Sequence, residues 1–468
     1  MDRAEAFADA APLSFWLDDP AAPEPAMPLV GPVTADLVVV GGGYTGLWAA
    51  LLAKGDDPSA DVVVLEGDRC GWAASGRNGG FCAASLTHGL GNGAERFPDE
   101  IRTLEQLGRQ NLDAIEMAVA DEGIDCGFER TGELDVATEP HQVAWLRDAE
   151  AQSREFGADP VFLDGDELQS EIHSPGFLAG LWDPDSCALV NPARLAWGLR
   201  AACERAGVRI FEHTTVDGLG PDGPGTSAPM VVHAAHGRVT ATRVVLATNA
   251  SPSPVRRLRK YIVPVYDYVL MTEPLTRAQT ESVGWHRRQG IGTSGNQFLY
   301  YRRTADNRIL FGGYDAVYHY GSSMGPSLEQ RPATFTLLST LFAGTFPSLE
   351  DVRFTHSWSG AIDTCTRFCA FFDRSSDGRV SSAAGYTGLG VGASRFGARV
   401  ALDLVSGAET ELTRLRFVRS KPIPFPPEPV RSIGINLTRW SMARADARHG
   451  KRNLWLQALD AVGLGFDS

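Results

Sequence analysis

The sequence predicts an α/β protein in which a Rossmann-like dinucleotide-binding domain is interleaved with an α+β domain built on a largely antiparallel sheet. Three observations support this fold class. A buried strand, a glycine-rich turn and a helix follow one another over residues 36–53, and a second glycine-rich turn opens the apolar helix that ends near residue 405. The segments between them alternate as antiparallel strands do. Because related turns stand near both ends of the chain, the dinucleotide-binding domain is expected to be discontinuous.

Composition limits the class of protein. The 468 residues suffice for two compact domains, and an apolar content of 43% excludes wholesale disorder. The net charge of −14 argues against nucleic acid or an anionic membrane as the main partner. Seven scattered cysteines do not suggest a disulfide framework, and the pair Cys365 and Cys369 has no second Cys or His pair to complete a metal site. We therefore expect no metal and a reducing compartment.

The N-terminal region does not predict export. It lacks the basic start, apolar run and cleavage site of a signal peptide. The uncharged stretch over residues 37–53 is shorter than the roughly 20 residues of a spanning helix and contains a glycine triplet. The expectation is a cytoplasmic protein with no membrane partner.

The first glycine turn carries a dinucleotide fingerprint. The β-branched strand Asp36–Val40 runs directly into Gly41, Gly43 and Gly46, which fit the pattern G-x-G-x-x-G. Gly41 permits the tight turn, Gly43 the approach of a pyrophosphate, and Gly46 the contact between helix and strand. The phosphates are then expected at the amino-terminal end of the following helix, where backbone N–H groups are unpaired.

An acidic residue follows at the distance that the fingerprint requires. The second buried strand, Asp61–Leu65, ends at Glu66, 20 residues after Gly46. A carboxylate at about this spacing accepts hydrogen bonds from ribose hydroxyls. It would repel a 2′-phosphate, so the sequence disfavours NADP in this site.

The next loop distinguishes FAD from NAD by resemblance. Residues 71–80 form a second glycine-rich loop, and Ser75–Gly80 is similar to the S-G-R-N-G-G segment of D-amino-acid-oxidase-like flavoproteins of the gamma-glutamylputrescine and aminophosphonate oxidoreductase types. In that family this segment lies against the flavin and its linker. The resemblance implies FAD as cofactor and a cofactor domain of the glutathione-reductase type.

Three later segments extend the resemblance over the whole chain. Residues 189–216 look like the family's helix and strand that bring a valine backbone to adenine, which makes Val216 the candidate. Residues 243–250 resemble the strand with an A-T-x-A/G ending that passes the cofactor. Residues 384–392 resemble the turn that faces the pyrimidine end of the flavin, where reduction creates negative charge. The residues expected at the cofactor are Gly41, Gly43, Tyr44, Thr45, Gly46, Glu66, Gly67, Ser75, Gly76, Arg77, Asn78, Gly79, Gly80, Val216, Ala247, Thr248, Gly388, Leu389, Gly390 and Val391.

The domain boundaries follow from these motifs. Alternating segments over residues 127–137, 261–270, 298–302 and 308–312 predict a sheet that faces the cofactor on one side. The cofactor domain is accordingly expected to comprise residues 1–90, 186–260 and 352–468. The substrate domain is expected to comprise residues 91–185 and 261–351.

Candidate substrate residues come from this sheet. Four tyrosines stand on its strands, and Tyr266 and Tyr268 share one face, although alternation does not say which face the flavin occupies. We take these two as candidates for an aromatic substrate box. Arg302 is the candidate anchor for a carboxylate, phosphonate or carbonyl, because a guanidinium binds planar anions bidentately. Trp358 matches a W-x-G stretch of related oxidases and is expected to border the active site.

The electron acceptor is left open. Sarcosine-oxidase-type relatives use a lysine near the flavin to promote oxygen reduction, whereas Lys260 is the only lysine between residues 54 and 421. Either Arg77, a histidine or the surroundings of the reduced flavin assist oxygen, or electrons pass to another acceptor. His88 and His356 are candidate proton acceptors. The histidine and late cysteine that would attach flavin covalently are not evident, so FAD is expected to be noncovalent.

The functional prediction is an FAD-dependent amine or amino-acid oxidoreductase. Hydride would leave the carbon next to nitrogen for flavin N5, and the resulting imine would hydrolyse. The alternatives are an aminophosphonate oxidoreductase, a dehydrogenase that does not use oxygen, and a catalytically silent assembly subunit. The expected partners are a small amine and an electron acceptor, and the oligomeric state is open.

Overall fold

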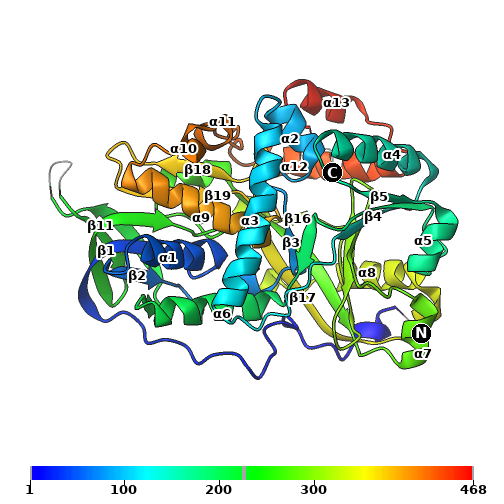
Figure 1. The fold of residues 1–468 in the computed structure, drawn as a ribbon, viewed down its shortest axis with the longest axis horizontal. Coiled ribbons are helices and arrows are strands. Elements are labelled where there is room, and N and C mark those ends of the chain that lie inside the picture. Colours follow the sequence, from blue (N-terminus) through cyan, green and yellow to red (C-terminus); the bar gives the residue numbers. More distant parts are fainter. Residues whose placement is uncertain (1–2, 224–227, 466–468) are drawn as a thin grey trace.

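A computed structural model describes residues 3–223 and 228–465, which form two large β-sheets flanked by helices (Figure 1). We call the first the cofactor sheet; its strand order is β18-β19-β11-β1-β2-β8, with β10 on β11 and β9 on β10. Its strands are β1 (Gly31–Val40), β2 (Val62–Leu65), β8 (Arg209–Phe211), β9 (Val216–Pro221), β10 (Met230–Ala234), β11 (Gly237–Leu246), β18 (Phe371–Arg374) and β19 (Val380–Ala384).

The centre of the cofactor sheet is parallel. Strand β1 pairs in parallel with β2 on one side and β11 on the other. The run Val38–Val40 of β1 and all of β2 are buried, as expected for strands that are covered on both faces. This arrangement confirms the predicted Rossmann-like half of the fold.

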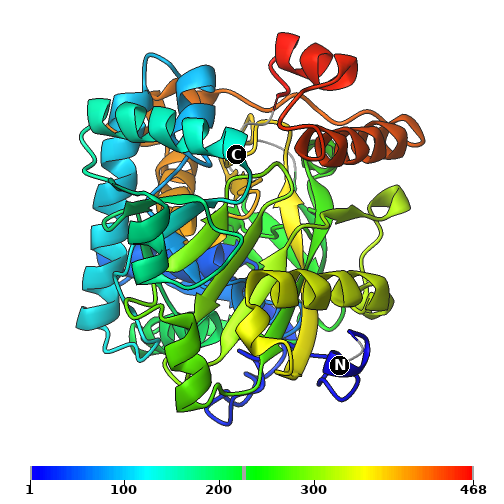
Figure 2. The same ribbon diagram turned by 90° about the vertical axis from the view of Figure 1, so that its right-hand side faces the viewer.

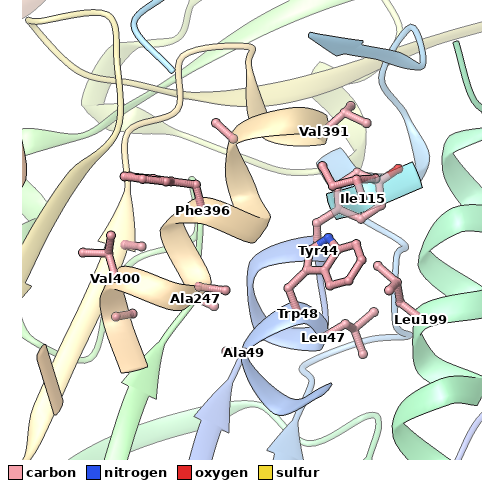
Figure 3. Close-up of a cluster of buried hydrophobic side chains, with 14 of the residues drawn as sticks. Tyr44, Leu47, Trp48, Ala49, Ile115, Leu199, Ala247, Val391, Phe396 and Val400 are labelled. Carbon is pink, nitrogen blue, oxygen red and sulfur yellow. The ribbon is translucent and has the colours of Figure 1, made fainter. Parts of the chain in front are cut away.

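Helices from distant parts of the chain pack together on one face of this sheet. Figure 3 shows Trp48 of α1, Ile115 of α3, Leu199 of α6 and Phe396 of α9 meeting in one cluster of buried side chains. The helices concerned are α1 (Tyr44–Asp56), α3 (Ile101–Asp121), α6 (Pro192–Arg205) and α9 (Gly390–Ser406). Helices α1 and α9 follow the two glycine turns, and their packing in one buried cluster with α3 and α6 fixes the position of one turn relative to the other.

The second sheet, here the substrate sheet, has the order β16-β12-β15-β14-β13-β4-β6-β5, with β17 on the other side of β12. All its pairs are antiparallel except β13 with β4. Its strands are β4 (Glu133–Ala137), β5 (Val161–Leu163), β6 (Ala179–Asp183), β12 (Val263–Thr272), β13 (Gly290–Thr293), β14 (Leu299–Arg303), β15 (Ile309–Gly313), β16 (Val317–Tyr318) and β17 (Phe354–Thr364). The predicted, largely antiparallel sheet is confirmed.

Helix α8 (Pro332–Thr345) covers one face of the substrate sheet, as Figure 2 shows. Its Phe335 ring meets Tyr268 of β12 edge-on, with ring centroids 5.7 Å apart. Phe342 adds to the same buried cluster, together with Tyr301 and Phe311 from the neighbouring strands. The opposite face of the sheet is therefore the one left for a ligand.

Two predicted domain boundaries differ from the observed packing. Strand β17 pairs with β12 along nearly its whole length, so the chain leaves the substrate sheet after Thr364 and not at residue 352. Helix α3 packs into the cofactor-sheet core, although residues 91–185 were assigned to the substrate domain. The boundaries were placed where cofactor motifs end, and motifs do not reveal which partner a strand or helix packs against.

The remaining elements lie at the periphery. C-terminal helices α12 (Val430–Asp446) and α13 (Leu454–Ala461) lie near α4 at one end of the molecule (Figure 1). A short hairpin pairs β3 (Phe81–Ala83) with β7 (Cys187–Leu189). The other helices are α2 (Leu90–Arg96), α4 (Pro140–Glu155), α5 (Gly165–Glu171), α7 (Arg277–Val283), α10 (Glu411–Arg414) and α11 (Arg416–Arg419). None of the helices formed by the described residues is long and apolar enough to cross a bilayer.

Candidate cofactor and substrate site

A cavity of about 1210 Å³ lies between the two sheets and is lined by both of them and by α12. It exceeds the roughly 300–1,000 Å³ of a typical small-ligand pocket, so its size suits a cofactor together with a substrate. The predicted cofactor residues that line it are Gly41, Gly43, Tyr44, Thr45, Glu66, Gly67, Ser75, Arg77, Asn78, Gly79, Val216, Ala247, Thr248, Gly388, Leu389, Gly390 and Val391.

The first glycine turn is too crowded for side chains. Gly41 has a φ of +111°, and a Cβ there would lie 2.4 Å from the carbonyl oxygen of Ala247. A Cβ on Gly46 would lie 1.8 Å from the carbonyl oxygen of Gly41, so Gly46 serves helix–strand packing and does not line the cavity. Gly43 is the N-cap of α1 and supplies no side-chain cap. The N–H of Tyr44 donates to Ser75 Oγ at 3.0 Å, and the N–H groups that follow it in the first turn are left for an anion.

Glu66 stands at the cavity end of β2. Its carboxylate accepts hydrogen bonds from the backbone N–H groups of Gly42, at 2.6 Å, and Asp68, at 2.9 Å. Burial raises the pKa of Glu66, and these two hydrogen bonds oppose the rise. Val216 and Gly67 line the same end of the cavity. An acceptor held this firmly fits the ribose hydroxyls of a dinucleotide.

The loop over residues 75–80 is held by hydrogen bonds from its own Asn78 side chain and by hydrogen bonds from the N-terminal segment. The Asn78 side chain donates to the carbonyl oxygen of Ala74, at 2.9 Å, and accepts from the N–H of Gly80, at 2.8 Å. From the N-terminal segment, Ser14 donates to the carbonyl oxygen of Gly76 and Trp16 donates to that of Asn78, both at 2.9 Å. Gly76 and Gly80 do not line the cavity, and each lies against the backbone beneath the loop.

The late glycine turn is tied to the first. The Thr45 hydroxyl donates to the Tyr386 hydroxyl at 2.9 Å, which joins the start of α1 to the approach to α9. The Asp363 carboxylate accepts from the N–H of Gly385 at 2.6 Å. A Cβ on Gly392 would lie 2.1 Å from the carbonyl oxygen of Ala83, so α9 packs directly on backbone. Two helix N-termini thus open toward one cavity, as the pyrophosphate and the pyrimidine end of FAD require.

A model of the family described as FAD dependent oxidoreductase, also abbreviated DAO, matches residues 36–404. The chain belongs to this family. FAD is its cofactor, and the crowded glycine turns, Glu66 and the paired helix N-termini are residues that fit the group. The predicted family, fold class and cofactor are confirmed.

One relative is similar to the chain in sequence, and two solved structures are similar to it in fold. This chain is 31% identical to gamma-glutamylputrescine oxidoreductase of Escherichia coli K12 over 379 residues, which covers 80% of this chain and 84% of that protein. Glycine oxidase from Geobacillus kaustophilus superposes with a TM-score of 0.67 at 21% identity, covering 83% of this chain and 99% of that one. L-proline dehydrogenase from P. horikoshii gives a TM-score of 0.66 at 18% identity, covering 81% and 96%.

Arg302 is not placed as a substrate anchor. It is only 7% exposed, does not line the cavity, and donates to the carbonyl oxygen of Val190 at 2.6 Å and, more weakly, to those of Gly79 and Gly80. Burial lowers the pKa of Arg302 to about 10. The guanidinium therefore holds the underside of the 75–80 loop. The expected anchor role is therefore corrected. The strand position of Arg302 was predicted correctly, but its long side chain carries the guanidinium to the carbonyl oxygens beneath the loop and not into the cavity.

Two of the aromatic candidates face away from the cavity, and the third, Trp358, lies on the cavity face of the sheet but is buried beneath Arg77. Tyr266 and Tyr268 point into the buried cluster under α8, and the Tyr268 hydroxyl donates to the carbonyl oxygen of Leu328 at 2.8 Å. Trp358 is buried and donates to the carbonyl oxygen of Arg77 at 2.8 Å. None of the three lines the cavity, so the predicted substrate contacts of these residues are withdrawn. Sequence alternation correctly placed the two tyrosines on one face of the sheet, and the structure shows that this is the face covered by α8.

Residues on the other face of β12 were missed. Val263, Val265 and Asp267 line the cavity, and Tyr300 of β14 lines it beside them. The Tyr300 hydroxyl donates to Asp267 at 2.5 Å. Asp267, a lone carboxylate in an apolar strand and flanked by the two chosen tyrosines, was the available signal. Of the histidines, His88 lines the cavity and burial lowers its pKa, whereas His356 lies outside and contacts Asp18 at 3.1 Å.

Proposed function

We propose that the chain oxidises the carbon–nitrogen bond of a small primary or secondary amine or amino acid to an imine, which then hydrolyses. FAD, when bound, supplies the acceptor for the hydride. The observation that carries the proposal is that one continuous cavity is lined by the glycine turns of the cofactor sheet and by the face of the substrate sheet that α8 does not cover. On the sheet side this cavity offers aromatic rings from Phe298, Tyr300 and Tyr314 and a carboxyl from Asp267. Such a surface suits a small apolar substrate that carries an amine.

The relatives support this substrate class. The names of the curated relative and the two structural neighbours refer to a polyamine conjugate, glycine and proline, all of which carry an amine. One neighbour is named an oxidase and another a dehydrogenase, so the names do not favour one electron acceptor. The electron acceptor must be decided by experiment on this chain.

Two arginines of α12 favour an anionic far end of the substrate. Arg431 and Arg439 line the cavity. Arg439 pairs with Asp315 at 3.2 Å, and Arg431 donates to the Ser322 hydroxyl at 3.0 Å, so both retain N–H groups for a ligand. A carboxylate suits these donors, and a phosphonate does too. This pair keeps an aminophosphonate oxidoreductase as the second candidate.

The cavity wall provides no lysine that could promote the reduction of oxygen by the flavin, as far as the described residues go. Among the described residues that line the cavity there is no lysine, and Lys260 lies outside it. Arg77 lines it but is paired with Glu329 at 2.6 Å. We propose that a group other than lysine assists oxygen, or that another acceptor takes the electrons.

Attachment of FAD is proposed to be noncovalent. Cys365 lines the cavity, but its thiol shares a single S–H donor between the carbonyl oxygens of Cys369 and Gly385, at 3.2 and 3.3 Å. Burial raises the pKa of Cys365, which disfavours the reactive thiolate. Acid precipitation should leave the yellow colour in the supernatant; a yellow pellet would contradict this proposal.

The decisive experiment is anaerobic mixing of the holoprotein with a panel of neutral amines, amino acids and aminophosphonates while the visible flavin absorbance is followed. Bleaching by any amine supports the proposed function, and preference for aminophosphonates supports the second candidate. Recovery of colour in air indicates an oxidase, and persistence of the bleached form indicates a dehydrogenase. A holoprotein that no member of the panel bleaches would support the silent-subunit alternative and contradict the proposal.

A further inference from the structure

A carboxyl–phenol pair stands on the cavity face of the substrate sheet. Tyr300 Oη donates to Asp267 Oδ2 at 2.5 Å, and the backbone N–H of Tyr268 donates to Asp267 Oδ1 at 3.0 Å. Both side chains line the cavity. Because β12 and β14 are separated in the sheet by β15, the pair spans three strands and its geometry is fixed by the sheet.

The pair lies beside the loop that holds the flavin side of the cavity. Asp267 faces Gly360 across the β12–β17 pairing, and a Cβ on Gly360 would lie 3.5 Å from the Cβ of Arg77. A Cβ on Gly79 would lie 2.7 Å from the Tyr300 ring. The absence of side chains at Gly79 and Gly360 therefore leaves the sheet and the 75–80 loop in close contact at this point. A substrate that lies in the cavity next to this contact has Asp267 within its surroundings.

The carboxyl of Asp267 is not neutralised by a cation. The ion pairs formed by the described residues include none with Asp267. Arg77 is committed to Glu329, and the Arg302 guanidinium is directed to backbone carbonyls beneath the loop. Burial raises the pKa of Asp267 to about 6, while hydrogen bonds from Tyr300 and the backbone of Tyr268 and Gly313 limit the rise. The carboxylate is thus the main form at neutral pH, and it retains basicity that an exposed aspartate lacks.

The other buried carboxyls that line the cavity are bound to the glycine turns or are protonated at neutral pH. Asp363 accepts from the N–H of Gly385, and Glu66 accepts from two backbone N–H groups. Glu133 lines the cavity as well, but burial and the neighbouring Asp135 raise its pKa to about 8. Of these four, Asp267 combines a position beside the 75–80 loop with an ionised form at neutral pH.

We propose that Asp267 accepts the proton from the ammonium group of the substrate and that Tyr300 positions the carboxylate for this step. The N–H bond of the ammonium breaks, an O–H bond forms on Asp267, and the electron pair stays on nitrogen. No oxidation accompanies the transfer. The neutral amine is the form from which hydride can leave, and the cationic substrate is also attracted by the unpaired carboxylate. This inference rests on the proposed function, since it requires an amine substrate.

The test compares three isosteric variants of the holoprotein, with FAD content and Tm measured for each. In Asp267→Asn the rate of anaerobic flavin reduction at pH 7 should fall about 100-fold or more, within the range of general base catalysis. The loss should diminish as the pH approaches the amine's own pKa, where solvent supplies the neutral form. Tyr300→Phe should shift the wild-type rise in rate to higher pH, because it removes a hydrogen bond that stabilises the carboxylate. Tyr301→Phe is the matched control, since this neighbour lies in the core and its hydroxyl has no partner.

A second readout separates this inference from the proposed function. Difference infrared spectra between pH 5 and pH 8 should show a carboxyl titration in the wild type that is missing in Asp267→Asn. Wild-type reduction rates with unchanged pH dependence in Asp267→Asn, or no carboxyl signal that depends on Asp267, would overturn the assignment. A wild type that no amine reduces would contradict the proposed function, and the proton-acceptor role would then fall with it even if the titration were seen.

Discussion

The two walls of the cavity differ in how they are made. On the cofactor side, the wall consists of tightly packed backbone turns. A Cβ on Gly41, which lines the cavity, would lie 2.4 Å from a carbonyl oxygen, and a Cβ on Gly46, just behind the wall, would lie 1.8 Å from one. On the sheet side, the wall consists of side chains from strands far apart in the sequence, such as Asp267 and Tyr300. Backbone contacts tolerate almost no substitution, whereas a side-chain wall can change with the substrate. Cofactor binding and substrate choice are therefore separable in this protein.

The largest effect is expected from Gly46→Ala. The new Cβ would lie 1.8 Å from the carbonyl oxygen of Gly41, and neither backbone segment can move without opening the turn. We expect a loss of stability of about 3 kcal/mol or more and loss of bound FAD. The measurements are the FAD-to-protein ratio after gel filtration and the free energy of unfolding.

Gly55→Ala is the matched control for this substitution. Gly55 belongs to the same helix and a Cβ there meets no atom within 4 Å, so the variant should be neutral or stabilised by up to about 1 kcal/mol. Equal behaviour of the two variants would show that the turn is more tolerant than its geometry indicates.

Arg302→Met is expected to have the next largest effect. It leaves the carbonyl oxygen of Val190 without its charged donor and loosens the 75–80 loop, at a cost of about 2–4 kcal/mol in stability. Flavin reduction should slow by a similar factor for neutral and anionic amines, because the loop and not the substrate is affected. A rise in KM confined to substrates with a carboxylate or phosphonate would restore Arg302 as an anchor.

The two buried aspartates on neighbouring strands allow a smaller, pH-dependent comparison. Burial raises the pKa of both Asp267 and Asp363 from 3.8 to about 6. Since the folded state binds these protons more tightly than the unfolded state, each carboxyl lowers stability as the pH rises from about 4 to 6. Asp267→Asn should therefore gain up to about 2 kcal/mol relative to wild type between pH 4 and pH 7.5.

Denaturant unfolding at the two pH values measures this gain. Asp363→Asn should show the same pH-dependent gain but be less stable than Asp267→Asn at both pH values. Asp363 accepts from the fixed backbone N–H groups of Gly385, Tyr386 and Thr387, whereas one donor to Asp267 is the Tyr300 hydroxyl, which can rotate. A flat difference between Asp267→Asn and wild type would mean that Asp267 is solvated like a surface carboxyl.

The contrast between the walls also explains what the sequence could predict. Gly41, Gly43, Gly46 and Glu66 form a local pattern whose spacing is dictated by one strand–turn–helix, so the cofactor and the first half of the fold were readable. The face of β12 that meets the ligand could not be predicted, because alternation shows only that the side chains of Tyr266 and Tyr268 point to the same face. Which face meets the ligand depends on where α8 packs, and that is decided by residues some 60 positions away.

Other contacts at the site had no sequence signal of their own. The N-terminal segment braces the 75–80 loop through Trp16, and helix α12 contributes Arg431 and Arg439 to the cavity from outside the region matched by the family. Arg302 was a reasonable candidate by charge, and its guanidinium was instead taken up by buried carbonyl oxygens. Long side chains of this kind are assigned a role only when the loop they reach is known.

The smallest expected effect is that of Tyr268→Phe, and it tests the corrected face of β12 directly. The substitution removes the hydrogen bond from the hydroxyl to the carbonyl oxygen of Leu328 and leaves the ring packed against Phe335. Stability should fall by about 1 kcal/mol, and the rate of flavin reduction should be unchanged at every pH. Stopped-flow reduction beside denaturant unfolding separates the two. A tenfold slower reduction with unchanged stability would place the hydroxyl at the substrate after all, and the cavity face of β12 would then have to be reassigned from Asp267 to its neighbours.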